Sequence, residues 1–337
     1  MVRSERSGWA GFQCMRAGKE LILATKPFAE EQRGRSWRLF LGTVALLALA
    51  LWGTLVEIPL PMRAVSSVLA GLLTVRLFVI YHDFEHHAIL RKSSVADCLM
   101  AICGIYCLAA PSVWKSSHDY HHTHNSKLRT AHIGSFPIMT RSGFEQASRA
   151  ERFAYLFARH PLTILFGYLT IFLAGMCLLP FLRSPRKHFD CLLALVLHLG
   201  LATTLFAVGG WLDMILFLIA PHFIASAAGA YLFYAQHNFP QARHYAKSEW
   251  SYAGAALESS SFMRMPRWLH WFTANIGYHH LHHLNARIPF YRLPEAMSEL
   301  PEAQTPRSTS LSPAEVIRCL RLKFWDPEAG RMVGWRG

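Results

Sequence analysis

Two long apolar runs near the start of the chain set the first element of the predicted fold. Residues 37–57 and 63–81 are each long enough to span a membrane as a helix, and the turn 58–62, with two prolines, separates them. We therefore predict a helical hairpin whose N-terminal end lies on the cytoplasmic side. Arg76 lies about one and a half turns before His82, so we expect its side chain to reach the same membrane surface.

Further apolar runs follow along the chain, at 95–113, 162–182, 189–208 and 211–234. Histidine-rich stretches lie between these runs. They can bind a common metal site only if they all lie on the same side of the membrane. We therefore predict that 95–113 and 162–182 are re-entrant or interfacial. The loop 183–188 is strongly basic and belongs in the cytoplasm, so the last two runs form a second hairpin around Gly209 and Gly210. The alternative to these four crossings is six crossings, with 162–182 paired differently.

The expected architecture is an all-α integral membrane protein with about four transmembrane helices, in two hairpins. Most of the polar and charged residues lie in 120–160 and 235–337, which we expect to form a cytoplasmic helical cap. Residues 313–325 are amphipathic and suited to the membrane surface. Along the chain we expect a polar basic N-terminal segment, a membrane domain and an amphipathic tail, with the bounds 1–36, 37–312 and 313–337.

Composition supports a membrane protein and argues against nucleic-acid binding. Hydrophobic residues make up 52% of the chain, charged residues only 16%, and the mean hydropathy is +0.20. The net charge is +13, but the basic residues flank apolar runs and no nucleic-acid motif is present. The first 36 residues lack the early apolar core of a signal peptide. The seven cysteines form no CxxC pair, and Cys98, Cys103 and Cys107 are expected to be packing residues.

Three short histidine clusters carry the candidate chemistry. They occupy residues 82–87, 118–124 and 279–283. Two histidines of the first cluster are four residues apart, and those of the other two repeat at i, i+3 and i+4, so each cluster presents two or three imidazoles on one helix face. Neutral imidazole binds iron, zinc, copper and nickel, and eight imidazoles suit two metals better than one. Clustered histidines repel when protonated and cost desolvation, so a purely structural role is disfavoured. The isolated histidines, in contrast, are expected to be hydrogen-bonded packing residues: His160, His188, His198, His222, His244 and His270.

The pattern HxxxH, HxxHH, HxxHH with membrane spans between resembles the membrane fatty acid desaturase superfamily, from about Trp37 onward. The closest resemblance is to bacterial acyl-lipid desaturases of the delta-12/omega-6 type. It rests on residues 81–90 (YHDFEHHAIL), 114–122 (WKSSHDYHH) and 277–291 (GYHHLHHLNARIPFY), with Gln236-His237-Asn238 as a weaker element. The resemblance implies two non-haem irons and nine ligands: His82, His86, His118, His121, His122, His237, His279, His282 and His283.

The same resemblance implies an O2-dependent oxidoreductase that inserts a double bond into a fatty acyl chain bound to lipid, CoA or a carrier. No dinucleotide, iron–sulfur or haem motif is present, so we expect a separate electron donor such as a ferredoxin or cytochrome, steered by the basic cap. The expected location is the bacterial inner membrane, with the site on the cytoplasmic face. Aromatic residues are candidates to line an acyl tunnel: Trp114, Phe262, Trp268, Trp271 and Phe272.

Polar residues near the histidine clusters could support the metal ligands, and other functions share parts of the pattern. The carboxylate and amide candidates to hold the ligating imidazoles are Asp83, Asp119, Glu258 and Asn275. His87, His124 and His280 are extra histidines in the clusters. A carotenoid ketolase or hydroxylase, or an acyl hydroxylase, shares the histidine pattern. A metal transporter or sensor is disfavoured because ionisable residues are scarce inside the spans, and a structural zinc protein because such sites favour cysteine.

Overall fold

Four long helices running away from a mixed polar region dominate the computed structural model, which describes residues 15–128, 130 and 133–335. The first predicted hairpin is formed by α2 (Arg33–Gly53) and α3 (Leu60–Glu85), and each helix begins a few residues earlier than the apolar pattern predicts. Helix α3 continues four residues past the predicted end, because the first histidine cluster prolongs its buried face. The second hairpin turns inside α10 (Phe189–Met214), and its second arm continues through the π-helical segment η3 (Ile215–Ile219) into α11 (Ala220–His237).

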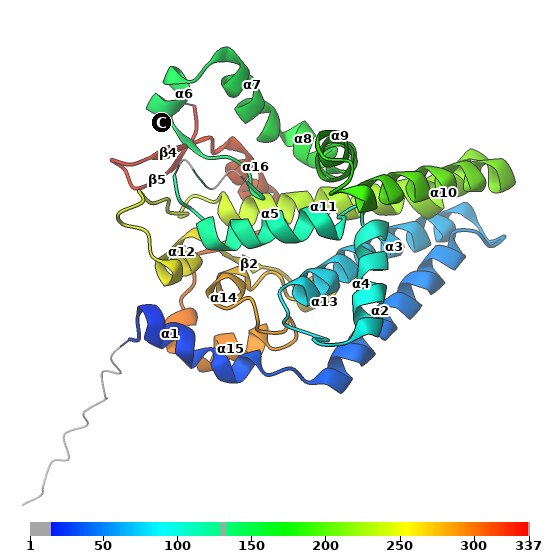
Figure 1. The fold of residues 1–337 in the computed structure, drawn as a ribbon, viewed down its shortest axis with the longest axis horizontal. Helices are drawn as coiled ribbons and strands as arrows, with labels where there is room; N and C mark the ends of the chain where they lie inside the picture. Colours follow the sequence, from blue (N-terminus) through cyan, green and yellow to red (C-terminus); the bar gives the residue numbers. More distant parts are fainter. Residues whose placement is uncertain (1–14, 129, 131–132, 336–337) are drawn as a thin grey trace, which may run out of the picture.

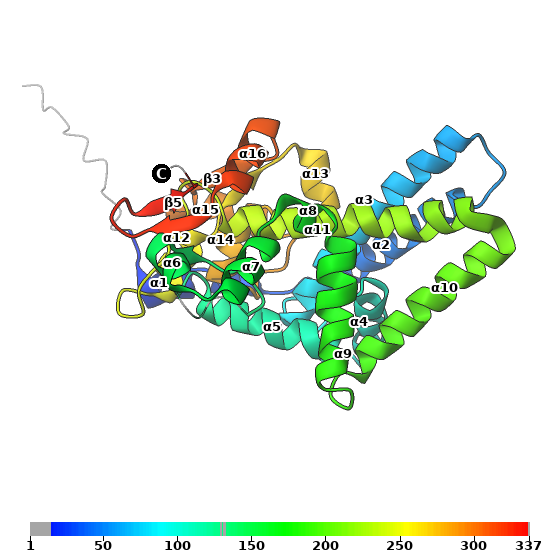
Figure 2. The same ribbon diagram turned by 90° about the horizontal axis from the view of Figure 1, so that it is seen from above.

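The second hairpin turns at the predicted glycines. Gly210 has a φ of 78°, which only glycine adopts without strain, and the chain reverses there (Figures 1 and 2). A straight helix of the 49 residues from Phe189 to His237 would be about 74 Å long, more than twice the thickness of a bilayer core. Leu199, Phe206 and Val208 are among many exposed apolar side chains on these helices, as expected where a protein faces lipid.

By length and composition, three helices in the described part of the chain can cross a membrane, and a bent pair makes up to four. The bent pair is α4 (Ser94–Tyr106) with α5 (Pro111–His124), which meet at 90° as a broken span or re-entrant loop. Residues 161–183 form α8 (Pro161–Leu165) and then a short apolar helix made of η2 (Tyr168–Leu178) and α9 (Leu179–Arg183). This helix runs across the long helices (Figure 2), so an interfacial position stays the prediction.

The cap departs from the all-helical expectation, because it contains two small sheets. In one, β1 (Met139–Thr140) pairs parallel with β4 (Phe324–Asp326), which pairs antiparallel with β5 (Arg331–Val333). In the other, β2 (Phe262–Arg264) pairs parallel with β3 (Ser308–Ser310). Strands of two or three residues leave no periodic pattern, and their partners lie far apart in the sequence. The remaining elements are short helices: α1 (Gly18–Ala24), η1 (Lys26–Ala29), α6 (Arg141–Gln146), α7 (Arg149–Ala158), α12 (Tyr252–Ser259), α13 (Arg267–Phe272), α14 (His279–Leu284), α15 (Leu293–Glu299), η4 (Pro301–Ala303) and α16 (Pro313–Arg321).

Arg76 is buried between the first hairpin and α13. Its side chain is 3% exposed, and it donates hydrogen bonds to Thr43 Oγ1 at 3.0 Å and to the carbonyl of Trp271. The guanidinium also lies 4.2 Å from the centre of the Trp271 ring. Arg76 therefore ties the first hairpin to α13 of the cap. The three-part division of the chain stays a prediction, and residues 1–14 and 336–337 of its outer parts lie outside the described residues.

Candidate metal centre

The three histidine clusters and the end of α11 meet where the long helices enter the cap. His82 is in the last turn of α3 and His86 caps that helix, while α5 carries the second cluster and α14 the third. His237 is the last residue of α11. The i, i+4 spacing that suggested shared helix faces is thus realised at α3, α5 and α14, and α11 adds a single histidine.

All nine predicted ligands fall into two groups, in each of which the candidate ligand atoms lie within 4.8 Å of one another. Both the second and the third clusters contribute to both groups, so the groups are side by side. Eight of the nine side chains are buried and His86 is half-buried. The first group contains His82, His86, His118, His122 and His282, and the second contains His121, His237, His279 and His283.

Within each group the imidazoles point the same nitrogen at one another. In the first group, Nε2 of His118 lies 2.8 Å from Nε2 of His82 and 3.1 Å from that of His122. In the second, Nε2 of His279 lies 2.8 Å from Nε2 of His237 and 3.1 Å from that of His283. A neutral imidazole carries a single N–H, so a nitrogen between two others can satisfy only one of them. A cation at the centre of each group satisfies all of these lone pairs together, and this donor set fits two metal ions.

One histidine in each group has its orientation fixed from behind. His82 Nδ1 lies 3.4 Å from Asp83 Oδ1, and His237 Nδ1 lies 3.1 Å from the carbonyl oxygen of Ser259. A hydrogen on Nδ1 donates to these oxygens and leaves Nε2 as a lone pair that faces the group. Asp83 is itself held, because its Oδ2 accepts the backbone N–H of Phe290 at 2.6 Å. The Ser259 contact was not predicted, since a backbone carbonyl leaves no signal in the sequence.

The other three polar candidates do not touch a ligating histidine. Asp119 has a 54% exposed side chain and pairs with Lys115 one helix turn away, so the geometry gives it no supporting role. Glu258 pairs with Arg243 and Arg307 on the cap. The amide of Asn275 donates to the carbonyl of Phe290 at 3.0 Å. Asn275 therefore contacts the residue whose backbone N–H binds Asp83, and not a histidine.

The remaining histidines lie outside both groups. His124 stacks on Tyr120, His280 is buried without a hydrogen-bond partner among the described residues, and His87 is exposed. His198 and His222 have hydrogen-bond partners inside the helix bundle, as expected of packing residues. His188 differs, because it lies in a third, smaller group with Asp190 and Cys191.

Burial sets the protonation of the third cluster. Desolvation, reinforced by neighbouring imidazoles, lowers the pKa of His279, His282 and His283 well below the usual 6.5. These three rings are therefore neutral at pH 7, which is the form that binds a metal.

An apolar cavity of about 480 Å³ borders both groups through His82, His118 and His279. Its walls come from α3, α5, the 168–183 helix and α11. Among the aromatic candidates only Trp114 lines it, together with Phe78 and other apolar side chains that the sequence analysis did not select. Trp268 and Trp271 are exposed, so that part of the predicted tunnel is wrong. Phe262 lies in β2, and the other three aromatic residues lie in α13.

The geometry can now be compared with known proteins. The family model described as "Fatty acid desaturase" matches residues 59–312, three quarters of the chain and all nine histidines. The chain belongs to the fatty acid desaturase family. This confirms the resemblance inferred from the histidine stretches, and membership in the family favours a desaturase over a carotenoid-modifying enzyme, a transporter or a metal sensor.

Several relatives carry the similarity over most of this desaturase. A fatty acid desaturase of Bacillus subtilis (strain 168) is 29% identical over 274 residues, covering 81% of this chain and 77% of that protein. An sn-1 oleoyl-lipid 12-desaturase of Synechocystis sp. is 22% identical over 276 residues, covering 81% and 78%. An sn-1 acyl-lipid omega-3 desaturase (ferredoxin) of Nostoc sp. is 23% identical over 236 residues, covering 65% and 62%. This desaturase is thus an oxidoreductase of acyl chains and a membrane protein.

Proposed function

We propose that this desaturase holds two irons in its two histidine groups and inserts a double bond into the acyl chain of a membrane lipid. The observation that carries the proposal is that nine imidazoles converge in two groups at the wall of an apolar cavity. The reaction removes two hydrogens from adjacent carbons, reduces O2 to two waters, and takes up two electrons and two protons from outside. The relatives named as acyl-lipid desaturases support a lipid substrate.

Each group of histidines would bind one of the two irons. The first group offers five imidazoles to one iron and the second offers four to the other. Iron with O2 supplies the oxidising power that breaks an unactivated C–H bond, which no side-chain acid or base provides. Asp83 and the Ser259 carbonyl keep His82 and His237 in the ligating tautomer.

The cavity would position the acyl chain and exclude water. It runs past His82 and His118 between apolar walls, so a saturated chain lies extended beside both groups. Phe78 and Trp114 pack edge to face at 4.9 Å, and Trp114 stacks on the ring of His118 at 4.7 Å. These contacts fix the wall against which adjacent methylenes rest, and this placement selects the bond that is oxidised.

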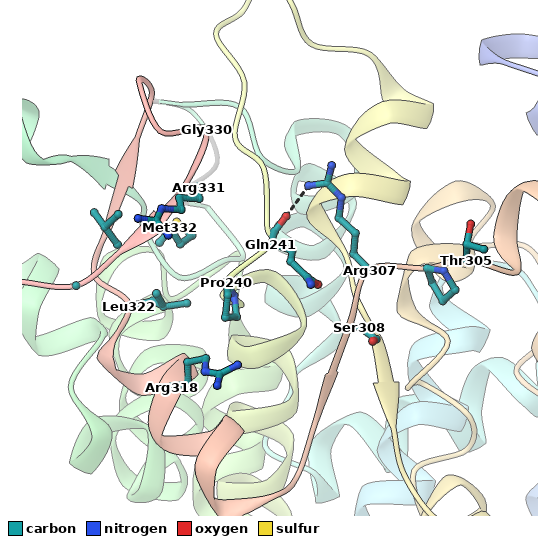
Figure 3. Close-up of a pocket in the computed structure, with 13 residues that line it drawn as sticks. Pro240, Gln241, Thr305, Arg307, Ser308, Arg318, Leu322, Gly330, Arg331 and Met332 are labelled. Carbon is teal, nitrogen blue, oxygen red and sulfur yellow. Dashed lines mark hydrogen bonds between the residues drawn. The ribbon is translucent and has the colours of Figure 1, made fainter. Parts of the chain in front are cut away.

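Electrons would come from a separate, acidic carrier protein. A surface recess of about 870 Å³ on the cap is bordered by Arg307, Arg318 and Arg331, and its floor includes Pro240 and Gln241 (Figure 3). These floor residues follow His237 by three and four positions, so their backbone is at most about 14 Å from it. Arg307 donates a hydrogen bond to the Gln241 carbonyl, the contact drawn in Figure 3. A carrier steered by the net charge of +13 gives faster turnover at low ionic strength.

The proposed location is the inner membrane of a bacterium, with the cap and both irons on the cytoplasmic face. The basic residues that flank the spans support this orientation by the positive-inside rule. Residues 37–312 form the desaturase domain in this proposal, with four crossings in two hairpins.

Expression in a bacterium tests the proposal, with cellular fatty acids read by mass spectrometry. New unsaturated species are expected from the natural chain and are expected to vanish in His282→Ala. His124→Ala is the matched control, since His124 belongs to the second cluster but to neither group. Altered carotenoids without new unsaturated fatty acids would instead identify a carotenoid-modifying enzyme, and unchanged lipids in cells that contain the iron-loaded protein would refute the proposal.

A further inference from the structure

A second hollow lies beside α5, next to the acyl cavity. It has a volume of about 440 Å³ and is bordered by three basic side chains, those of Arg183, Lys187 and His188, with Ser116 and Tyr120 on the facing helix. We call it the basic recess. None of the nine candidate metal ligands lines it, and the proposed reaction does not use these basic residues.

The positive charge of the basic recess is not neutralised by the protein. Among the residues that the structure describes, no carboxylate lies within ion-pair distance of Arg183 or Lys187. The nearby Asp190 is occupied, because its two oxygens accept the backbone N–H and the hydroxyl of Ser112 at 2.9 and 2.6 Å. The same hydroxyl lies 2.8 Å from His188 Nδ1, which fixes that ring at the edge of the recess. A site with two unpaired cations and an oriented imidazole is suited to an anion.

The basic recess and the acyl cavity adjoin each other. Both are bordered by α5 and by the helix 168–183, and Ser117 lines both. On that helix Met176 borders the cavity and Pro180 the recess, one turn or about 6 Å further on. At the junction Gly134 lies against Ser117, where an added Cβ would be 2.1 Å from the Ser117 carbonyl oxygen. The charged recess thus lies next to the apolar cavity, an arrangement suited to a molecule with a charged end and an apolar tail.

The position of the basic recess favours a lipid over a soluble carrier. It lies at the end of a short apolar helix that crosses the long helices (Figure 2), and its basic residues are flanked by exposed apolar ones. Leu182 is 62% exposed beside Arg183, and Phe189 is 63% exposed beside His188. Cations bounded by exposed apolar side chains are typical of the depth at which lipid head groups lie.

We propose that the basic recess binds the phosphate of a membrane glycerophospholipid while one acyl chain passes Ser117 into the cavity. This inference rests on the proposed function, because it names the head group of the substrate. The phosphates of an acyl-CoA share the same chemistry, and the test below separates the two sources. Arg183 and Lys187 act here as substrate-binding residues that hold the head group, and they take no part in hydrogen removal.

The test compares head groups at constant acyl chains. The iron-loaded enzyme and its Arg183→Gln/Lys187→Gln variant are assayed with phosphatidylglycerol, with a glycosyl diacylglycerol that has no phosphate, and with the acyl-CoA. For phosphatidylglycerol we expect KM to rise roughly fivefold for each charge removed, with kcat unchanged. The glycosyl lipid should show no change. Arg321→Gln is the matched control, since Arg321 is an exposed arginine on α16 that does not line the basic recess.

A binding measurement separates this inference from the proposed function. Retention of phosphatidylglycerol by the detergent-purified protein, read by native mass spectrometry, requires no turnover. Loss of retention in the double variant but not in Arg321→Gln supports the head-group site even if no desaturation is found. Equal KM changes for phosphatidylglycerol and the glycosyl lipid, no change for either, or an effect confined to the acyl-CoA would each overturn it.

Discussion

Asp83 and Asp119 offer a direct test of how the protein controls its candidate metal ligands. Each aspartate follows a cluster histidine in sequence, His82 or His118, and sequence reasoning treats the two alike. The structure separates them, because Asp83 is 1% exposed and contacts His82, whereas Asp119 is exposed and contacts Lys115. We predict that Asp83→Asn weakens iron binding and that Asp119→Asn does not.

The expected size of the effect follows from the hydrogen bonds of Asp83. The asparagine oxygen takes the shorter contact, that with the N–H of Phe290, so its NH2 group turns toward His82 Nδ1. That contact favours the tautomer with hydrogen on Nε2, which cannot bind a metal through Nε2. Loss of such a supporting contact typically weakens metal affinity about 10- to 100-fold, or by about 1.4–2.7 kcal/mol. The Asp119–Lys115 pair is exposed and screened, so its loss costs almost nothing.

Iron content during titration with a competing chelator measures this difference. Of the two proposed irons, the Asp83→Asn protein should lose that of the first group at lower chelator concentrations than the natural chain, and should keep the other. Asp119→Asn should follow the natural chain throughout. The reasoning is refuted if Asp83→Asn titrates as the natural chain does, or if the two variants lose iron alike.

Three further predictions concern the cavity, the turn beside it and the N-terminal region. Gly229→Leu places a side chain where an added Cβ meets open space in the cavity wall. We expect the variant to desaturate shorter acyl chains than the natural enzyme, because each methylene excluded from the cavity costs about 0.8 kcal/mol of binding. Product analysis against Gly200→Leu, a lipid-side position that also meets open space, checks this. Gly134→Ala should destabilise the protein by about 1–3 kcal/mol, because φ is +65° and the new Cβ meets the Ser117 carbonyl; an unchanged unfolding temperature in micelles would contradict it. The hydrogen bond from Arg16 lowers the pKa of Glu302 to about 2 from 4.5, so this pair stabilises the fold above pH 4.5 and loses its effect as the pH falls toward 2. The difference in unfolding temperature between the natural chain and Arg16→Gln should narrow over that range, and a constant difference would argue against the pair.

The sequence alone determined the features that depend on spacing along the chain. Apolar runs of about 20 residues predicted both hairpins and the glycine turn of the second, since a span and its reversal are local properties. Histidines at i and i+4, with i+3 added in the second and third clusters, predicted helix faces that present imidazoles, and all nine candidates lie in the two groups. The helix faces required only the helical period and the chemistry of imidazole, whereas His237 was selected by the resemblance to the desaturase superfamily.

Tertiary structure alone decided which side chains meet across the fold. Helical spacing cannot say that His121 joins the group of His279 and His283 while its neighbour His122 joins that of His282. The same holds for Asp83 over Asp119, for the buried position of Arg76, and for the cavity wall. The short strands of the cap also depend on distant partners, because two or three residues form a strand only beside another segment. The sequence period determines which side chains share one face of a helix. Packing between helices that are far apart in the chain determines which residues that face contacts.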